Sequence, residues 1–115
     1  MVLIVSTAWF PIDKANDVAK KYLEVLKKYP PDESLGKELT TAVKVTKEGI
    51  KVIGIGEVVK GKVEDYVARA TVSAQEYARI EGFKYEIELF MDMMEALAVV
   101  GLKPPEEAEA PEIYQ

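Results

Sequence analysis

The sequence contains neither cysteine nor histidine among its 115 residues. The absence of cysteine excludes disulfides, thiolate nucleophiles and iron–sulfur ligation, and the absence of histidine excludes imidazole bases and the usual zinc sites. We therefore expect no metal and no cofactor. The remaining carboxylates, amines and hydroxyls support ligand binding more readily than acid–base catalysis near neutral pH.

Positive charge is also scarce, since 15 basic residues face 20 acidic ones and the net charge is -5. A phosphate backbone would be repelled, so nucleic acid is not expected as a partner. Part of the excess lies in residues 103–115, which hold one lysine, four glutamates and three prolines. This composition predicts an extended acidic arm after a single domain at residues 1–102.

Long apolar runs are absent as well. The apolar first ten residues have no basic segment before them, and charge returns at Asp13, so we expect neither a signal peptide nor a membrane span. A cytoplasmic location follows as an expectation. Side-chain amides occur only at Asn16, Gln75 and Gln115, while lysine and glutamate are plentiful, a composition typical of thermophile proteins.

Hydrophobic periodicity predicts four strands and three helices. In chain order these are a strand at 2–9, a helix at 13–29, a hairpin of strands at 37–47 and 50–60, a helix at 62–81, a strand at 83–91 and a short helix at 92–100. Asp13 is the expected N-cap of the first helix, and Pro30 ends it. The periodicity of residues 92–100 also fits a continued strand, but we favour the helix.

The order βαββαβ matches the ferredoxin-like split βαβ unit, an α+β fold. Right-handed crossovers predict an antiparallel sheet of order 4-1-3-2, with both long helices on one face. The other face then stays bare, although the strands at 2–9 and 50–60 are largely apolar on both faces. A second copy is the simplest cover, so we expect a homodimer or larger assembly, with Ile53 and Ile55 at the interface.

Alternation along residues 37–47 predicts two distinct faces for that strand. Leu39, Thr41, Val43 and Val45 share one face, and Glu38, Thr40, Ala42, Lys44 and Thr46 share the other. In the next strand Gly54 and Gly56 lie on one face, which would admit a close helix or a bulky ring such as that of Trp9. They do not match a dinucleotide fingerprint, because they lie within a strand rather than at a strand-to-helix turn.

Aromatic residues supply the best candidate for a ligand site. We predict a pocket between the sheet and the two helices, bordered by Trp9, Tyr22, Tyr66 and Tyr85, where a small molecule could bond to buried hydroxyls. Core packing is the ordinary alternative. A second candidate, the carboxylates of Glu86 and Glu88, is better explained as charge that protects an edge strand from aggregation.

Residues 2 to about 101 resemble the dimeric α+β barrel group in element order and in the apolar character of both sheet faces. The resemblance implies two sheets paired face to face, and it opens the possibility of a cofactor-free monooxygenase or isomerase. Three classes are therefore open. The leading one is a non-enzymatic homo-oligomer that binds a small, partly apolar molecule; the others are such an enzyme and a regulatory module like the ACT domains. No catalytic residue is assigned.

Overall fold

The computed structural model describes residues 1–103; residues 104–115, most of the acidic arm, lie outside the described part. The elements in chain order are β1 (Leu3–Phe10), the short 3-10 helix η1 (Ile12–Lys14), α1 (Ala15–Lys28), β2 (Gly36–Thr46), β3 (Gly49–Val58), α2 (Val63–Gln75), β4 (Lys84–Phe90) and α3 (Met93–Val99). The expected four strands and three helices are present, and residues 93–99 are helical as favoured.

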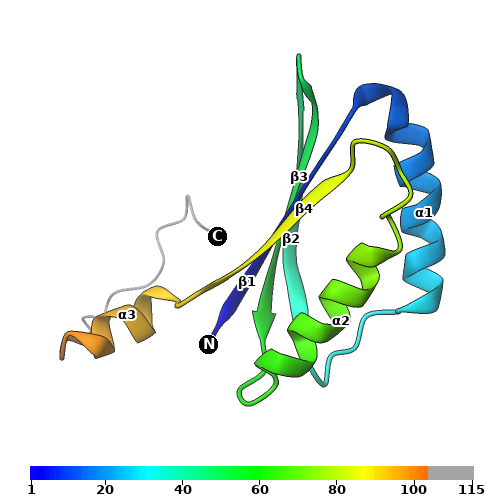
Figure 1. The fold of residues 1–115 in the computed structure, drawn as a ribbon. Helices are drawn as coiled ribbons and strands as arrows, with labels where there is room; N and C mark the ends of the chain where they lie inside the picture. The colour runs from blue at the N-terminus through cyan, green and yellow to red at the C-terminus, as the bar shows by residue number, and fades with distance from the viewer. Residues whose placement is uncertain (104–115) are drawn as a thin grey trace.

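The four strands form one antiparallel sheet in the order β2-β3-β1-β4. Helices α1 and α2 lie on one side of this sheet, and α3 lies on the other side, beyond the end of β4 (Figure 1). A split βαβ unit with both long helices on one side is the ferredoxin-like arrangement. The chain is therefore a ferredoxin-like α+β domain.

We call the sheet surface away from α1 and α2 the open face. Strand register and side-chain alternation place its residues. They are Lys37, Thr40, Ala42 and Lys44 from β2, Lys51, Ile53, Ile55 and Glu57 from β3, Leu3, Val5, Thr7 and Trp9 from β1, and Lys84, Glu86, Glu88 and Phe90 from β4. The two middle strands of this face are largely apolar.

Strand β2 departs from the alternation expected for it. Its pairing with β3 shifts between Glu38 and Thr40, so that Glu38 opposes Gly56 while Thr41 opposes Gly54. Such a bulge inserts one unpaired residue, so the residues of the strand before it point to the face opposite to the one that strict alternation predicts. Glu38 consequently shares the helix-side face with Thr41, and the expectation that they lie on opposite faces is wrong.

The two long helices also differ from expectation at their ends. Helix α1 follows a turn of 3-10 helix, and no side chain caps it, so Asp13 is not its N-cap. Helix α2 ends at Gln75 instead of Glu81. From there the backbone bonds run three residues back, from Tyr77 to Ala74 and from Ile80 to Tyr77. This tighter winding turns the chain towards β4 before the helical pattern of the sequence ends.

The ring of Tyr66, from α2, lies close against the sheet over two glycines. A β-carbon on Gly56 would lie 2.5 Å from the Tyr66 hydroxyl oxygen, and one on Gly36 would lie 2.7 Å from the ring. These positions therefore require glycine for close approach. The expectation that glycines on this face accommodate an aromatic ring is met by Tyr66, whereas Trp9 lies on the open face.

Few apolar side chains of the described part are buried. They are Ile4, Phe10, Val25 and Val58. They come from the sheet and from α1, while α2 contributes none, and the space between sheet and helices is larger than these side chains fill. Ser6 faces the helices from the middle of β1 and is nevertheless exposed. The layer between sheet and helices is therefore hollow.

Candidate functional site

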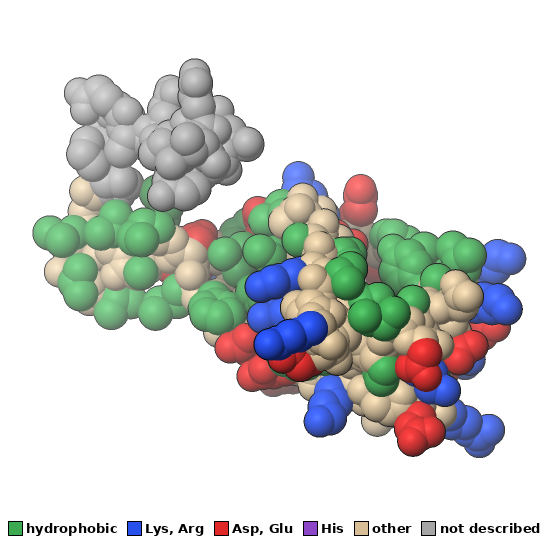
Figure 2. All heavy atoms as spheres, turned by 90° about the horizontal axis from the view of Figure 1, so that it is seen from above, with side chains coloured by type: hydrophobic (Ala, Val, Ile, Leu, Met, Phe, Trp, Pro, Cys, Tyr) green, Lys and Arg blue, Asp and Glu red, His purple; other side chains and the backbone are tan. Residues whose placement is uncertain are grey.

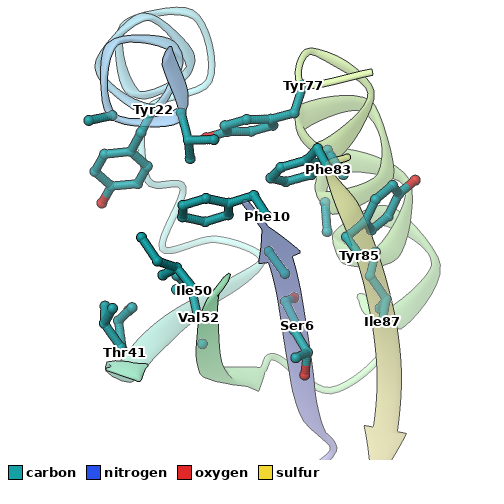
Figure 3. A pocket seen from close by; sticks show the side chains of 18 of the residues that line it. Ser6, Phe10, Tyr22, Thr41, Ile50, Val52, Tyr77, Phe83, Tyr85 and Ile87 are labelled. Carbon is teal, nitrogen blue, oxygen red and sulfur yellow. The ribbon is translucent and has the colours of Figure 1, made fainter. Parts of the chain in front are cut away.

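A cavity of about 550 Å³ lies between the sheet and the helices α1 and α2. Its lining is mostly apolar and comes from every strand and from both helices (Figure 3). The residues include Ala15, Val18, Ala19 and Tyr22 of α1, Ala70 and Ala74 of α2, Ser6, Ala8 and Phe10 of β1, Glu38, Thr41 and Val43 of β2, Ile50, Val52 and Gly54 of β3, Tyr85 and Ile87 of β4, and Tyr77 and Phe83 from the α2–β4 connection.

Four aromatic rings form one wall of this cavity. Phe83 stacks on Tyr77 with 4.7 Å between ring centroids and on Phe10 with 6.1 Å. Tyr85 adds a tilted ring at 6.5 Å from Phe83. Stacked rings at these separations stabilise one another beyond the area they bury. Phe83 is thus the central ring of a preformed aromatic wall (Figure 3).

A second cavity of about 640 Å³ adjoins the first towards the other end of the helices. The two share lining residues, among them Ser6, Tyr22, Glu38, Gly54, Ala70 and Tyr77. The second cavity adds Tyr66 and, among charged residues, Asp32, Glu33, Lys37 and Arg69. Arg69 donates a hydrogen bond to the carbonyl oxygen of Pro30, which ties α2 to the segment after α1.

Polar groups are few in the first cavity, and Glu38 is the one charged residue that the described part of the chain contributes to its lining. The hydroxyl of Thr41 donates a hydrogen bond to a carboxylate oxygen of Glu38 across the bulge in β2. Burial raises the pKa of the Tyr66 hydroxyl, and the negative charge of Glu38 raises it further. The site therefore combines one carboxylate with neutral hydroxyls on a mostly apolar surface.

Tyr77 has the most strongly perturbed hydroxyl among the described residues. Burial, with a smaller contribution from Tyr22, raises the pKa of Tyr77 to about 12. Because the neutral form is favoured in the folded protein, its contribution to stability is present below the unfolded pKa near 10 and is lost as pH rises towards 12. At neutral pH the Tyr77 hydroxyl is a hydrogen-bond donor.

We expect a late step in the alkaline titration of tyrosine ultraviolet absorbance, near pH 12, that Tyr77→Phe abolishes. Wild-type stability should also decline between pH 10 and 12, and the Tyr77→Phe variant should lack that part of the decline. Urea-unfolded protein is the control, because all its tyrosines should titrate near pH 10. If Tyr77→Phe instead removes a tyrosine that titrates near pH 10 in the folded protein, burial of Tyr77 is contradicted.

The structure places three of the four predicted pocket residues around the two cavities. Tyr22 and Tyr85 line the first cavity, and Tyr22 and Tyr66 line the second. Trp9 does not belong to either set. It lies on the open face, 36% exposed, with the ammonium of Lys51 5.9 Å from its ring. Consecutive strand residues point to opposite faces, so Phe10 occupies the position that the prediction gave to Trp9.

Sequence reasoning missed several residues of the site. Phe10, Tyr77 and Phe83 form its aromatic wall, and Glu38 supplies its carboxylate. Tyr77 did belong to the inward stripe of the predicted second helix, and Phe83 to the apolar face of the last strand. Glu38 left no such signal, because the bulge that turns it inwards is invisible to strict alternation.

The other candidates do not form a chemical centre. Glu86 and Glu88 are exposed on the edge strand β4, on the open face. Residues 1–103 contain no group of acidic side chains arranged to hold a metal ion. In that same part of the chain, every helix is too short or too polar to cross a membrane.

Comparison with known proteins gives likeness of fold only. No family model and no curated protein matches the sequence. Among solved structures, a formyltetrahydrofolate deformylase from Pseudomonas putida KT2440 aligns with TM-score 0.46 and 9% identity over 76% of this chain. This chain spans only 28% of that protein's length.

Two further structures align over most of their own length. The de novo designed protein Foldit4 has TM-score 0.48 and 14% identity, with 78% of this chain and 94% of the designed chain covered. An uncharacterized NIPSNAP-like domain protein from Burkholderia xenovorans has TM-score 0.44 and 13% identity, with 90% of each chain covered.

Proposed function

We propose that this chain is a binding protein for a small, mostly apolar molecule held between its sheet and its two long helices. The observation that supports the proposal is the cavity of about 550 Å³, which falls within the usual range for small-molecule sites. Its aromatic wall of Phe10, Phe83 and Tyr77 is preformed, so a flat or branched apolar ligand would lose little to rearrangement on binding.

The lining also limits the charge of the ligand. Among residues 1–103, no lysine or arginine lines the first cavity, and the single charged residue in its lining is Glu38. An anionic ligand would leave its charge unpaired there, which is costly in an apolar site. A neutral ligand with a hydroxyl or amide, or an amine that faces Glu38, fits the lining better. Besides Glu38, the titratable groups of this lining are tyrosine hydroxyls, and burial holds that of Tyr77 neutral, so binding is favoured over acid–base catalysis near neutral pH.

The proposal includes self-association through the open face, as in the dimeric α+β barrel group that the sequence resembles. Ile53 and Ile55 lie on this face beside Val5 and Thr7 of β1. Apolar side chains of two central strands facing water in one copy are the kind of surface that a second copy covers. In that arrangement the ligand cavities lie on the outer sides of the paired sheets.

Binding is tested by calorimetry and thermal unfolding with three probes that share an apolar body: phenethyl alcohol, phenethylamine and phenylacetate. We expect the alcohol and the amine to bind and raise the melting temperature, and phenylacetate to bind at least about tenfold more weakly because its charge lacks a partner. Native mass spectrometry of freshly purified protein would add the mass of any retained molecule.

Two variants on α2 make the test specific to the cavity. Ala74 lines the cavity, so Ala74→Phe should place a ring inside it and weaken binding. Ala68 is exposed on the same helix and outside the lining, so Ala68→Phe should bind the probes as the wild type does. If no probe binds and no molecule is retained, the proposed function is wrong; equal binding by the two variants would place the ligand elsewhere.

A further inference from the structure

Helix α3 is apolar at every position except Glu95. Glu95 is its only charged residue, and the others are methionine, alanine, leucine and valine. Met93 is 71% exposed and Val99 is 72% exposed. Figure 2 shows hydrophobic side chains covering this end of the molecule. A helix that is apolar on most sides belongs in a buried environment, which residues 1–103 of a single copy do not provide.

The start of α3 is fixed to the sheet by polar contacts. Asp92 and Glu95 form a capping box at the first turn. The amino group of Met1 lies 2.5 Å from a carboxylate oxygen of Asp92 and 2.9 Å from one of Glu95. These contacts hold α3 in line with the end of β4. A helix of seven residues has little stability in water alone, so packing must supply the rest.

Helix α3 lies on the same side of the sheet as the open face, opposite to α1 and α2 (Figure 1). The open face carries apolar residues on its central strands, from Leu3 on β1 to Ile55 on β3. A molecule seated on that face would therefore also meet α3. The apolar residues at the centre of the open face and helix α3 form two apolar walls, with charged residues on the flanking edge strands.

We propose that a second copy of this chain covers that surface, and that α3 of each copy packs against the other copy. This inference rests on the self-association included in the proposed function, and it adds the segment that holds the two copies together. By two-fold symmetry each copy gives one α3 and receives one, so both exposed helices are buried at once.

The charges of the two edge strands indicate how the copies meet. On the open face, β2 carries Lys37 and Lys44, while β4 carries Glu86 and Glu88 after Lys84 at its start. A two-fold axis parallel to the strands sets β2 of each copy over β4 of the other. By the strand register, Lys37 then lies one open-face position along the strand from Glu88, while Lys44 lies opposite Lys84 and one such position from Glu86. An axis across the strands would set the glutamates of both copies together. The first arrangement is the one that we infer.

A membrane surface is the other occupant to consider for an exposed apolar helix. Helices that lie in a membrane interface are rich in lysine and arginine, whereas residues 85–102 contain neither, and α3 begins with Asp92 and Glu95. Repulsion from anionic lipid therefore makes a second copy the better partner.

The test combines light scattering with hydrogen exchange on the full chain. We expect a wild-type dimer in which the amides of residues 93–100 exchange at least about tenfold more slowly than in monomeric Ile55→Glu. Ile53→Glu serves as a second variant in case one of them unfolds. A wild-type monomer at micromolar concentration would contradict self-association itself. A dimer with unprotected α3 amides would overturn the inference about α3 alone.

Substitution of α3 gives an independent measurement. Val99→Asp with Val100→Asp should raise the dimer dissociation constant about 100-fold, because each carboxylate would be buried without a partner. The matched control is Ile12→Asp. Ile12 is an exposed apolar residue of η1, just before α1, so this substitution should leave dimerisation unchanged. Equal dissociation constants for the two variants would overturn the inference. Protection of α3 only with vesicles of phosphatidylcholine and phosphatidylglycerol would assign the helix to a membrane instead.

The inferred axis is tested by exchanging charges. Lys37→Glu should weaken the dimer about two- to fivefold, since the attraction between Lys37 and Glu88 of the other copy becomes repulsion in both halves of the interface. Adding Glu88→Lys to the same chain should restore it. A two-residue variant that associates more weakly still would contradict the placement of β2 over β4.

Discussion

Replacing Phe83 with alanine is expected to lower the free energy of unfolding by about 2–3 kcal/mol, somewhat less than the loss at a fully buried phenylalanine. Phe83 is half-buried and touches the rings of Tyr77, Phe10 and Tyr85. Its removal ends all three ring contacts and opens the wall of the cavity. Urea unfolding followed by circular dichroism measures the change.

The matched variant is Phe83→Leu, which keeps most of the apolar volume and removes only the ring. We expect it to retain about half of the lost stability, since stacking contributes about 0.5–1.5 kcal/mol for each pair. Probe binding should be weaker in both variants. An alanine variant as stable as the wild type would mean that the aromatic wall does not hold the helices on the sheet.

Replacing Gly56 with alanine is expected to lower the free energy of unfolding by about 1–3 kcal/mol, because the new methyl group has no space. Its β-carbon would lie 2.5 Å from the hydroxyl oxygen of Tyr66 and 3.1 Å from a methyl carbon of Ile4. Helix α2 would have to move away from the sheet. Thermal and urea unfolding of the variant measure this cost.

Gly54 provides the control, two residues earlier on the same face of β3. A β-carbon there would meet its nearest atom, a carboxylate oxygen of Glu38, at an ordinary 3.5 Å. Gly54→Ala should therefore leave stability unchanged or raise it by about 0.5 kcal/mol, because alanine restricts the unfolded chain. Adding Tyr66→Phe to Gly56→Ala should recover part of the loss, since it removes the closest atom. Equal effects at the two glycines would contradict the contact with Tyr66.

Much of the fold follows from periodicity that the sequence displays openly. Alternation identified the hairpin and the last strand, and spacing of three and four identified both long helices. The end of α2 was not predictable in this way, because residues 76–81 keep a helical pattern while the chain tightens to reach β4. The sequence pattern of residues 76–81 reflects their helix propensity, and the need to connect α2 to β4 overrides that propensity here.

The lining of the two cavities overlaps the predicted pocket only in part. A pocket between sheet and helices follows from tyrosines on the inward stripes, and Tyr22, Tyr66 and Tyr85 do line the two cavities. Whether Trp9 or Phe10 points towards the helices depends on which alternate residues of β1 face that side. Because β1 is apolar on both faces, its composition does not reveal which face is which, and only pairing with β3 and β4 sets it.

The bulge in β2 has a consequence for comparing this chain with others of the same fold. One extra residue between Glu38 and Thr41 is what turns a carboxylate towards an apolar chamber. A homologue that lacks this residue would keep the same strands and the same aromatic wall, yet would carry its acidic side chain on the opposite face of the sheet. A one-residue gap at this point of an alignment would therefore mark a change in ligand preference, even where every residue of the cavity wall is identical.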